Sequence, residues 1–182
     1  CTFCYRHMRG IRSFSSDYFF DYLEFLQDKF KTNYFSFGDE CFSSSKKWSW
    51  RFLEEIKKRN IDIKFQIFGM RVDTIDRELL KAFKEVGCWM IEYGFESGSQ
   101  KMLNIMEKRT SVEENINVAL CTKEVGIYSS PAFVLGMPGE TTKTIEETID
   151  FIKKINYPNL KKQKFFNLHY QNRWCNKIHS NV

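Results

Sequence analysis

Two cysteines at the start of the chain, Cys1 and Cys4, are separated by two residues and could bind a metal together. Pairs of this kind occur in zinc half-sites, in thiol–disulfide pairs and in loops that hold iron–sulfur clusters. Phe3 places an aromatic residue directly before the second cysteine. We interpret Cys1 and Cys4 as the last two ligands of an iron–sulfur loop, whose first cysteine would lie upstream of this chain.

Glycine and charged residues follow each of four apolar, strand-like runs. In parallel β/α folds the loops after the strands open on one face, which gathers their side chains. We therefore expect these groups to form one polar rim together with Cys1 and Cys4. They are Gly38-Asp39-Glu40, then Gly69, Arg71 and Asp73, then Glu96-Ser97-Gly98, and finally Gly136, Pro138, Gly139 and Glu140.

Helix-like and strand-like segments alternate along the chain, which predicts an α/β fold with a parallel sheet and crossover helices. Ser15-Ser16-Asp17 caps a helix with Tyr18, Tyr22, Phe25 and Leu26 at helical spacing, whereas Ile61, Ile63, Phe65 and Ile67 alternate as in a strand. Further helices are predicted over 48–59, 76–86, 102–106, 111–126 and 141–155, with strands over 34–37, 61–67, 88–95 and 130–135. A complete eight-unit barrel needs about 250 residues, so a chain of 182 residues fits only part of one.

Several motifs together resemble the core of the radical S-adenosylmethionine (radical SAM) superfamily, in the branch often fused to a cobalamin-binding domain. Cys1, Phe3 and Cys4 match the end of its C-x3-C-x-aromatic-C loop. The other matching segments are Tyr93-Gly94-Phe95-Glu96-Ser97-Gly98-Ser99-Gln100, Leu135-Gly136-Met137-Pro138-Gly139-Glu140-Thr141, Phe37-Gly38-Asp39-Glu40-Cys41-Phe42, Arg71-Val72-Asp73 and residues 82–88. The resemblance covers residues 1–155. It implies a partial (β/α)6 TIM-like barrel of parallel strands whose first strand is missing.

The resemblance also implies a [4Fe–4S] cluster and bound SAM. Cys1 and Cys4 would be metal ligands, with the third cysteine off the chain. Asp39 or Glu40 would accept from the methionine amine of SAM, Arg71 or Lys108 would meet its carboxylate, and Glu96 would accept from its ribose. The full set of implied cofactor-binding residues is Phe3, against the adenine, with Gly38, Asp39, Glu40, Arg71, Glu96, Ser97, Lys108 and Gly136. No catalytic residue is assigned.

For the longer parent enzyme, the family resemblance implies reductive cleavage of SAM to a 5′-deoxyadenosyl radical. The radical would modify a substrate, with cobalamin-dependent methylation and methylthiolation as candidate reactions. A reductant such as flavodoxin or ferredoxin would supply the electron. Because its cluster loop is incomplete, we expect this chain alone to be inactive.

Two other readings of the cysteine pair stay open at this point. The chain could be a non-catalytic thiol or zinc module that uses Cys1, Cys4 and two further ligands, or an inert fragment without any ligand. Individual residues also have structural alternatives. Arg71 could pair with Asp73 or Asp76, and Lys108 could lie at a solvated helix end. Met102, Leu103 and Met106 are most simply core residues.

The charge of the chain is concentrated at its C-terminal end. The net charge is +5, and residues 151–182 hold seven basic residues and no acidic ones. We expect residues 156–182 to be a separate basic tail, either disordered or a degenerate last strand near 164–170. Nucleic-acid binding through this tail is a weaker alternative. No apolar run is long enough to span a bilayer and no signal peptide is visible, so we expect a cytoplasmic protein with reduced thiols and no membrane partner.

Overall fold

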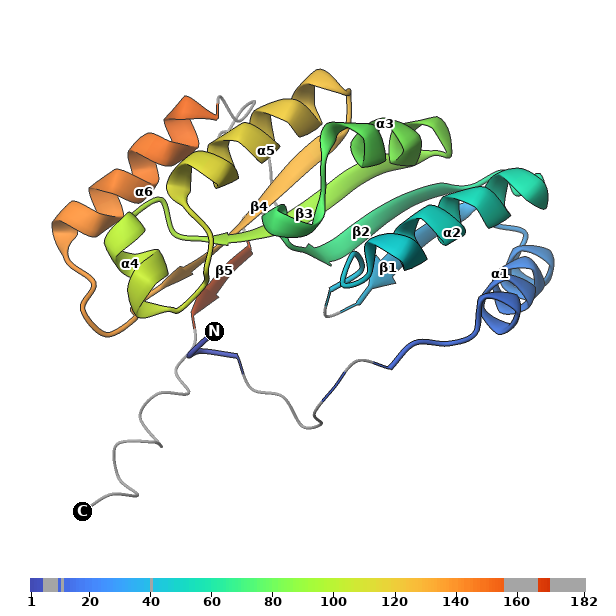
Figure 1. Ribbon diagram of the computed structural model, residues 1–182, viewed down its shortest axis with the longest axis horizontal. Coiled ribbons are helices and arrows are strands. Elements are labelled where there is room, and N and C mark those ends of the chain that lie inside the picture. Colours follow the sequence, from blue (N-terminus) through green and yellow to red (C-terminus); the bar gives the residue numbers. More distant parts are fainter. Residues whose placement is uncertain (5–9, 11, 40, 156–166, 171–182) are drawn as a thin grey trace, which may run out of the picture. The chain divides into compact units, whose positions relative to one another are not determined.

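The structure is a computed structural model that describes residues 1–4, 10, 12–39, 41–155 and 167–170 (Figure 1). Helices and parallel strands alternate along this part of the chain. The elements are α1 (Ser16–Phe30), β1 (Tyr34–Gly38), α2 (Lys46–Lys58), β2 (Lys64–Met70), a short 3-10 helix (Val72–Thr74), α3 (Arg77–Glu85), β3 (Cys88–Glu96), α4 (Gln100–Ile105), α5 (Val112–Glu124), β4 (Tyr128–Leu135), α6 (Thr142–Lys154) and β5 (Asn167–Tyr170). None of the helices in these residues is long and apolar enough to cross a membrane.

The chain divides into two compact parts, which are described separately. The N-terminal unit comprises Cys4–Tyr93 and Val118–Ser130, and the C-terminal unit comprises Cys1–Phe3, Gly94–Asn117 and Pro131–Val182. Strands β3 and β4 run through both units, so each unit contains part of the same β-structure. The boundary at residue 155 that we expect from the composition stays a prediction.

Strand order in the sheet follows the order along the chain, β1-β2-β3-β4-β5. In the N-terminal unit β1 pairs in parallel with β2, from Tyr34 opposite Lys64 to Gly38 opposite Phe68. In the C-terminal unit β4 pairs in parallel with β5. Among the described residues, β1 and β5 are the first and last strands of this order. The predicted α/β class with parallel strands is confirmed.

An aromatic core holds α2 against β1 and β2 in the N-terminal unit. The ring of Phe52 on α2 lies 5.6 Å from Phe37 on β1 and 5.6 Å from Phe65 on β2, measured between centroids. Both contacts are edge-on, the arrangement that aromatic quadrupoles favour. Phe83 of α3 lies 6.5 Å from Phe65, which extends the cluster to the next helix. Figure 1 shows α2 lying along these two strands.

Two predictions differ from the observed local structure. Strand β2 begins at Lys64 and not at Ile61, because its pairing with β1 starts at Lys64, opposite Tyr34. Ile63 is buried in the loop before the strand. Ile63 therefore contributes to the apolar alternation in the sequence although it lies outside strand β2. The helix α1 buries Phe20 and Leu23, whereas Tyr18, Tyr22 and Phe25 lie on its exposed face.

In the C-terminal unit, Gly98 lets α6 approach the loop after β3. A Cβ atom at this position would lie 2.5 Å from Cβ of Phe151 and 2.6 Å from Cα of Thr148. Neither atom can move without shifting α6. The Gly98 amide also donates to the Thr148 hydroxyl at 3.0 Å. This contact fixes the backbone that leads away from Glu96.

We predict that Gly98→Ala lowers the free energy of unfolding by about 1–3 kcal/mol, because the added methyl group forces α6 outward. Urea denaturation of the two proteins measures the difference. Gly38→Ala is the matched control, since a Cβ there meets nothing within 4 Å. Equal losses for both variants would contradict the close approach.

The buried Cys88 thiol predicts a pH dependence of stability. Burial raises the pKa of Cys88 from 9.0 to about 12. The folded state therefore keeps its proton when the unfolded state has lost it, so the contribution is complete below pH 9 and declines as the pH rises toward 12. Between pH 9 and pH 10.5 we expect wild type to lose about 1–2 kcal/mol more stability than Cys88→Ala. Parallel losses in the two proteins would rule this out.

Candidate functional site

The C-terminal unit contains a buried ion pair between Glu96 and Lys108. Glu96 is the last residue of β3, and Lys108 follows α4. The Lys108 Nζ atom lies 2.7 Å from Oε1 of Glu96, and the two side chains are 8% and 11% exposed, respectively. Removing a charged group from water costs several kcal/mol, so buried charges in proteins are normally paired. Lys108 is therefore not the solvated helix end that its position suggests.

Left-handed backbone conformations surround this ion pair. Glu96 has a φ angle of +63°, and the residues on either side of Lys108, Glu107 and Arg109, have φ angles of +50° and +60°. Such conformations are unfavourable for residues with side chains and are concentrated at functional sites. The ion pair thus lies among three residues with unfavourable backbone conformations.

Gly94 provides the surface on which the two charged groups lie. A Cβ atom at Gly94 would be 2.5 Å from Oε1 of Glu96 and 3.1 Å from Nζ of Lys108. Any larger residue would displace the carboxylate or the ammonium group. The glycine at position 94 is therefore required sterically, because a side chain there would occupy the space of the ion pair.

Asn115 at the start of α5 supports the same strand end, and our sequence analysis did not identify it. Its side-chain amide donates to the carbonyl of Phe95 at 3.3 Å, directly before Glu96. Asn115 is fully buried, and its Oδ1 atom has no partner among the described residues. Its only signal in the sequence is that it is a polar residue on the inner side of a predicted helix. Such residues are too common to identify a functional site.

The predicted residue Ser97 uses its hydroxyl within the protein. This group lies 3.2 Å from the Thr148 hydroxyl and accepts from the amide of Ser99 at 3.1 Å. Gly136 donates its amide to the Glu140 carboxylate, which folds the loop after β4. Their cofactor-binding roles stay predictions.

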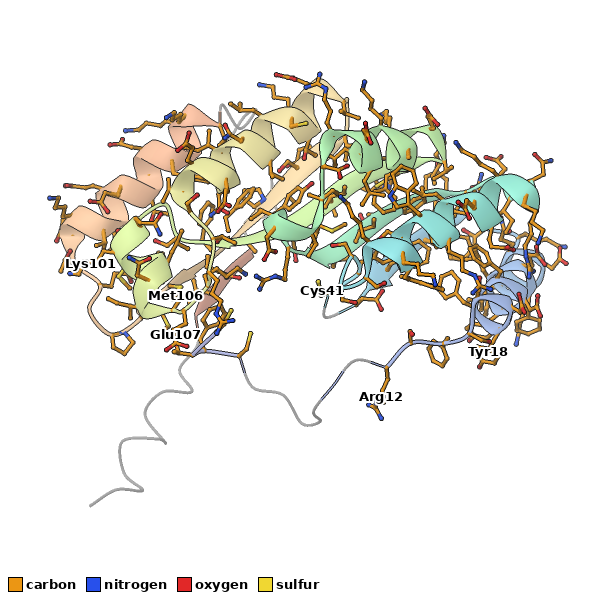
Figure 2. The ribbon with its side chains drawn as sticks, viewed as in Figure 1. Arg12, Tyr18, Cys41, Lys101, Met106 and Glu107 are labelled. Atoms are coloured by element: carbon orange, nitrogen blue, oxygen red, sulfur yellow. The ribbon has the colours of Figure 1, made fainter. Side chains whose placement is uncertain are left out.

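Residues 1–3 are held to the end of α4 in the same unit. The Thr2 amide donates to the Met106 carbonyl at 3.0 Å, and the Thr2 hydroxyl donates to the Ile105 carbonyl at 3.4 Å. Figure 2 labels Met106 and Glu107 at this point. Phe3 packs against a buried cluster of Met102, Met106, Val134 and Met137. The prediction that Met102, Leu103 and Met106 are core residues is confirmed.

The predicted residues of the N-terminal unit lie after β1 and β2. Arg71 forms two hydrogen bonds to Asp73, from Nε to Oδ1 at 2.9 Å and from Nη2 to Oδ2 at 2.7 Å. The alternative in which Arg71 pairs with Asp73 is therefore confirmed. Atoms around Asp39 shield its carboxyl from water and raise its pKa, although the side chain stays exposed. A cation beside Asp39 would offset that cost. Glu40 lies outside the described residues.

The thiols differ in accessibility. Cys1 and Cys4 are exposed and free, Cys41 is half-buried, and Cys88 is buried. Burial raises the pKa of Cys41, while the Arg71 guanidinium acts in the opposite direction. Within the described part of the chain, no group of three or more histidine, cysteine or carboxylate residues could hold a metal ion.

Comparison with known proteins identifies the family. The sequence model of the radical SAM superfamily matches residues 1–152. The chain belongs to the radical SAM superfamily. The match covers the segments on which the resemblance was based, from Cys1 to the helix after Glu140.

Relatives of this radical SAM chain are enzymes of several kinds. It is 28% identical to an uncharacterized methyltransferase of Pyrococcus horikoshii, over 86% of this chain and 34% of that protein. It is also 28% identical to an anaerobic magnesium-protoporphyrin IX monomethyl ester cyclase of Rubrivivax gelatinosus, over 86% of this chain and 29% of that protein. The chain thus spans about a third or less of these relatives.

Solved structures of cobalamin-dependent radical SAM enzymes share the fold. The enzyme OxsB, with aqua-cobalamin and S-adenosylmethionine bound, superposes with a TM-score of 0.71 at 24% identity, over 84% of this chain and 24% of that one. The methyltransferase TsrM of Kitasatospora setae, with cobalamin and a [4Fe–4S] cluster bound, gives a TM-score of 0.67 at 20% identity, over 76% and 28% of the two chains.

We predict that Lys108→Met lowers the free energy of unfolding by about 3–5 kcal/mol, because it leaves the Glu96 carboxylate buried without a cation. Adding Glu96→Leu to this variant should restore part of the loss, since no buried charge remains. Denaturation curves of the single and double variants measure the coupling.

The matched control is Lys101→Met, which replaces an exposed lysine of the same unit (Figure 2). It should change stability by less than about 0.5 kcal/mol. Additive losses in the Glu96–Lys108 double variant would contradict the ion pair.

Proposed function

We propose that this chain binds SAM through its C-terminal unit, with the Glu96 carboxylate as the acceptor for the ribose hydroxyls. The observation that carries the proposal is the buried carboxylate at the end of β3, fixed by Lys108 at 2.7 Å. Functional groups at the carboxyl ends of parallel strands are where β/α folds bind their ligands. Membership of the radical SAM superfamily supports SAM as that ligand.

The donor and acceptor capacity of Glu96 fits this role. A carboxylate has two oxygens and about four acceptor positions, and Lys108 contacts Oε1. Oε2 and the free positions on Oε1 are then available to two neighbouring hydroxyls. Lys108 in this account is a positioning residue, because it orients Glu96 and need not contact SAM.

Other residues of the C-terminal unit complete the proposed nucleoside contacts. Phe3 is only partly buried against its methionine cluster, so its ring can also pack against an adenine. Gly136 would allow the nucleoside close to the backbone. At the methionine end, the roles of Gly38, Asp39, Glu40 and Arg71 stay predictions.

For the longer protein, we propose the reductive cleavage of SAM that is typical of the superfamily. A [4Fe–4S] cluster supplies the electron in that chemistry, and Cys1 and Cys4 would contribute two of its thiolates. These two thiols do not form a complete cluster site within the described residues. An external reductant such as flavodoxin or ferredoxin would be required.

We further propose that the reaction is a methyl or methylthio transfer assisted by cobalamin. Relatives named as an uncharacterized methyltransferase and as a putative methylthiotransferase support the reaction class. Two cobalamin-dependent enzymes among the structural neighbours support the cofactor.

The proposal predicts that Glu96→Gln weakens SAM binding about 10- to 100-fold, because a hydrogen bond to a charged acceptor becomes one to a neutral amide. Isothermal titration calorimetry of SAM into the purified chain measures this change. Circular dichroism should show the same fold for both proteins.

Glu113→Gln is the matched control, because Glu113 is an exposed carboxylate of the same unit. It should bind SAM as wild type does. Unchanged affinity in Glu96→Gln, or wild-type protein that does not bind SAM, would refute the proposed role.

A further inference from the structure

The first helix presents four aromatic side chains to solvent. Phe14, Tyr18, Tyr22 and Phe25 form what we call the aromatic stripe, and each is between 52 and 68% exposed. The last three recur at helical spacing on α1, and Phe14 lies just before it. Contiguous exposed aromatic residues of this kind often mark a site of interaction with another molecule.

The rings of the aromatic stripe are ordered by contact with one another. Tyr18 lies 5.2 Å from Phe14 and 6.3 Å from Tyr22, and Tyr22 lies 6.1 Å from Phe25, measured between centroids. The planes of Tyr18 and Tyr22 differ by only 7°. Figure 2 shows Tyr18 among the side chains that project from α1. The stripe is therefore preorganised, and its own side chains would lose little conformational entropy when a partner binds.

A row of carboxylates lies beside the aromatic stripe, one position earlier in each turn. Asp17, Asp21 and Glu24 share one guanidinium, that of Arg59, at 3.7, 2.7 and 3.6 Å. Arg59 also binds Glu55 at 3.2 Å and is itself only 22% exposed. The row thus has more negative charge than its cation neutralises, and it keeps acceptor positions facing water.

Cations already stack on aromatic rings in this part of the molecule. Lys29 lies 5.3 Å from the ring centroid of Phe25, and Arg59 lies 5.5 Å from that of Phe20. Rings beside carboxylates suit guanidinium and ammonium groups, which can stack and form ion pairs at the same time. Phosphate groups of nucleic acids or anionic lipids would instead be repelled by the acidic row.

We propose that the aromatic stripe docks a polypeptide segment of a partner protein that carries arginine residues among apolar ones. The apolar side chains of the segment cover the rings. Its guanidinium groups stack on the tyrosines and pair with Asp17 and Asp21. This interaction does not depend on SAM binding, because it uses none of the residues to which a SAM contact is assigned.

Fluorescence anisotropy tests the proposal with a labelled helical peptide of alternating arginine and leucine pairs. Tyr18→Ser/Tyr22→Ser should weaken binding about 5- to 30-fold, which corresponds to two exposed cation–π contacts. Asp17→Asn should weaken it further, and added salt should reduce this second effect. Trp89→Ser, at an exposed aromatic residue of β3 in the same unit, should bind like wild type.

Three results would overturn the proposal. One is unchanged affinity in Tyr18→Ser/Tyr22→Ser. Another is equal binding of a peptide with glutamate in place of arginine, or of polyuridylate. The third is a dimer seen by light scattering that the double variant dissociates, since a second copy would then occupy the stripe.

Discussion

The ion pair between Glu96 and Lys108 is the interaction on which the candidate site depends. Burying a carboxylate or an ammonium group costs several kcal/mol. The pair is therefore stable only while the two groups stay in contact. Gly94 leaves room for them, and Glu96, Glu107 and Arg109 adopt left-handed backbone conformations around them. A local cost in backbone conformation thus gives a fixed, charged acceptor at the end of a strand.

The surrounding contacts explain why this acceptor can stay in place. Gly98 and Thr148 join the segment after Glu96 to α6, and Asn115 holds the carbonyl before it. These contacts join residues far apart in the sequence but within one unit of the protein. Rigid support of this kind is what allows a single carboxylate to select a diol, because a mobile group would lose entropy on binding.

Local signals allowed much of the fold to be predicted from the sequence. The helix predicted over 111–126 is observed as α5, and reciprocal hydrogen bonds of 2.6 and 3.1 Å between Ser111 and Glu114 cap its start. Helical spacing predicted α1 correctly but not its exposed face, because Tyr18 and Phe20 are both aromatic and only packing distinguishes them. Glu96 was predicted as a site residue. The burial of Lys108 was not predicted, because it depends on a tertiary contact with Glu96, twelve positions earlier in the sequence.

The central claim is tested most directly by removing the ribose hydroxyls and the carboxylate in turn. Calorimetry would compare SAM with its 2′,3′-dideoxy analogue on wild type and on Glu96→Gln. Our account predicts that losing the hydroxyls weakens binding about tenfold or more in wild type and little in the variant. An equal loss in both proteins would show that Glu96 does not receive the ribose.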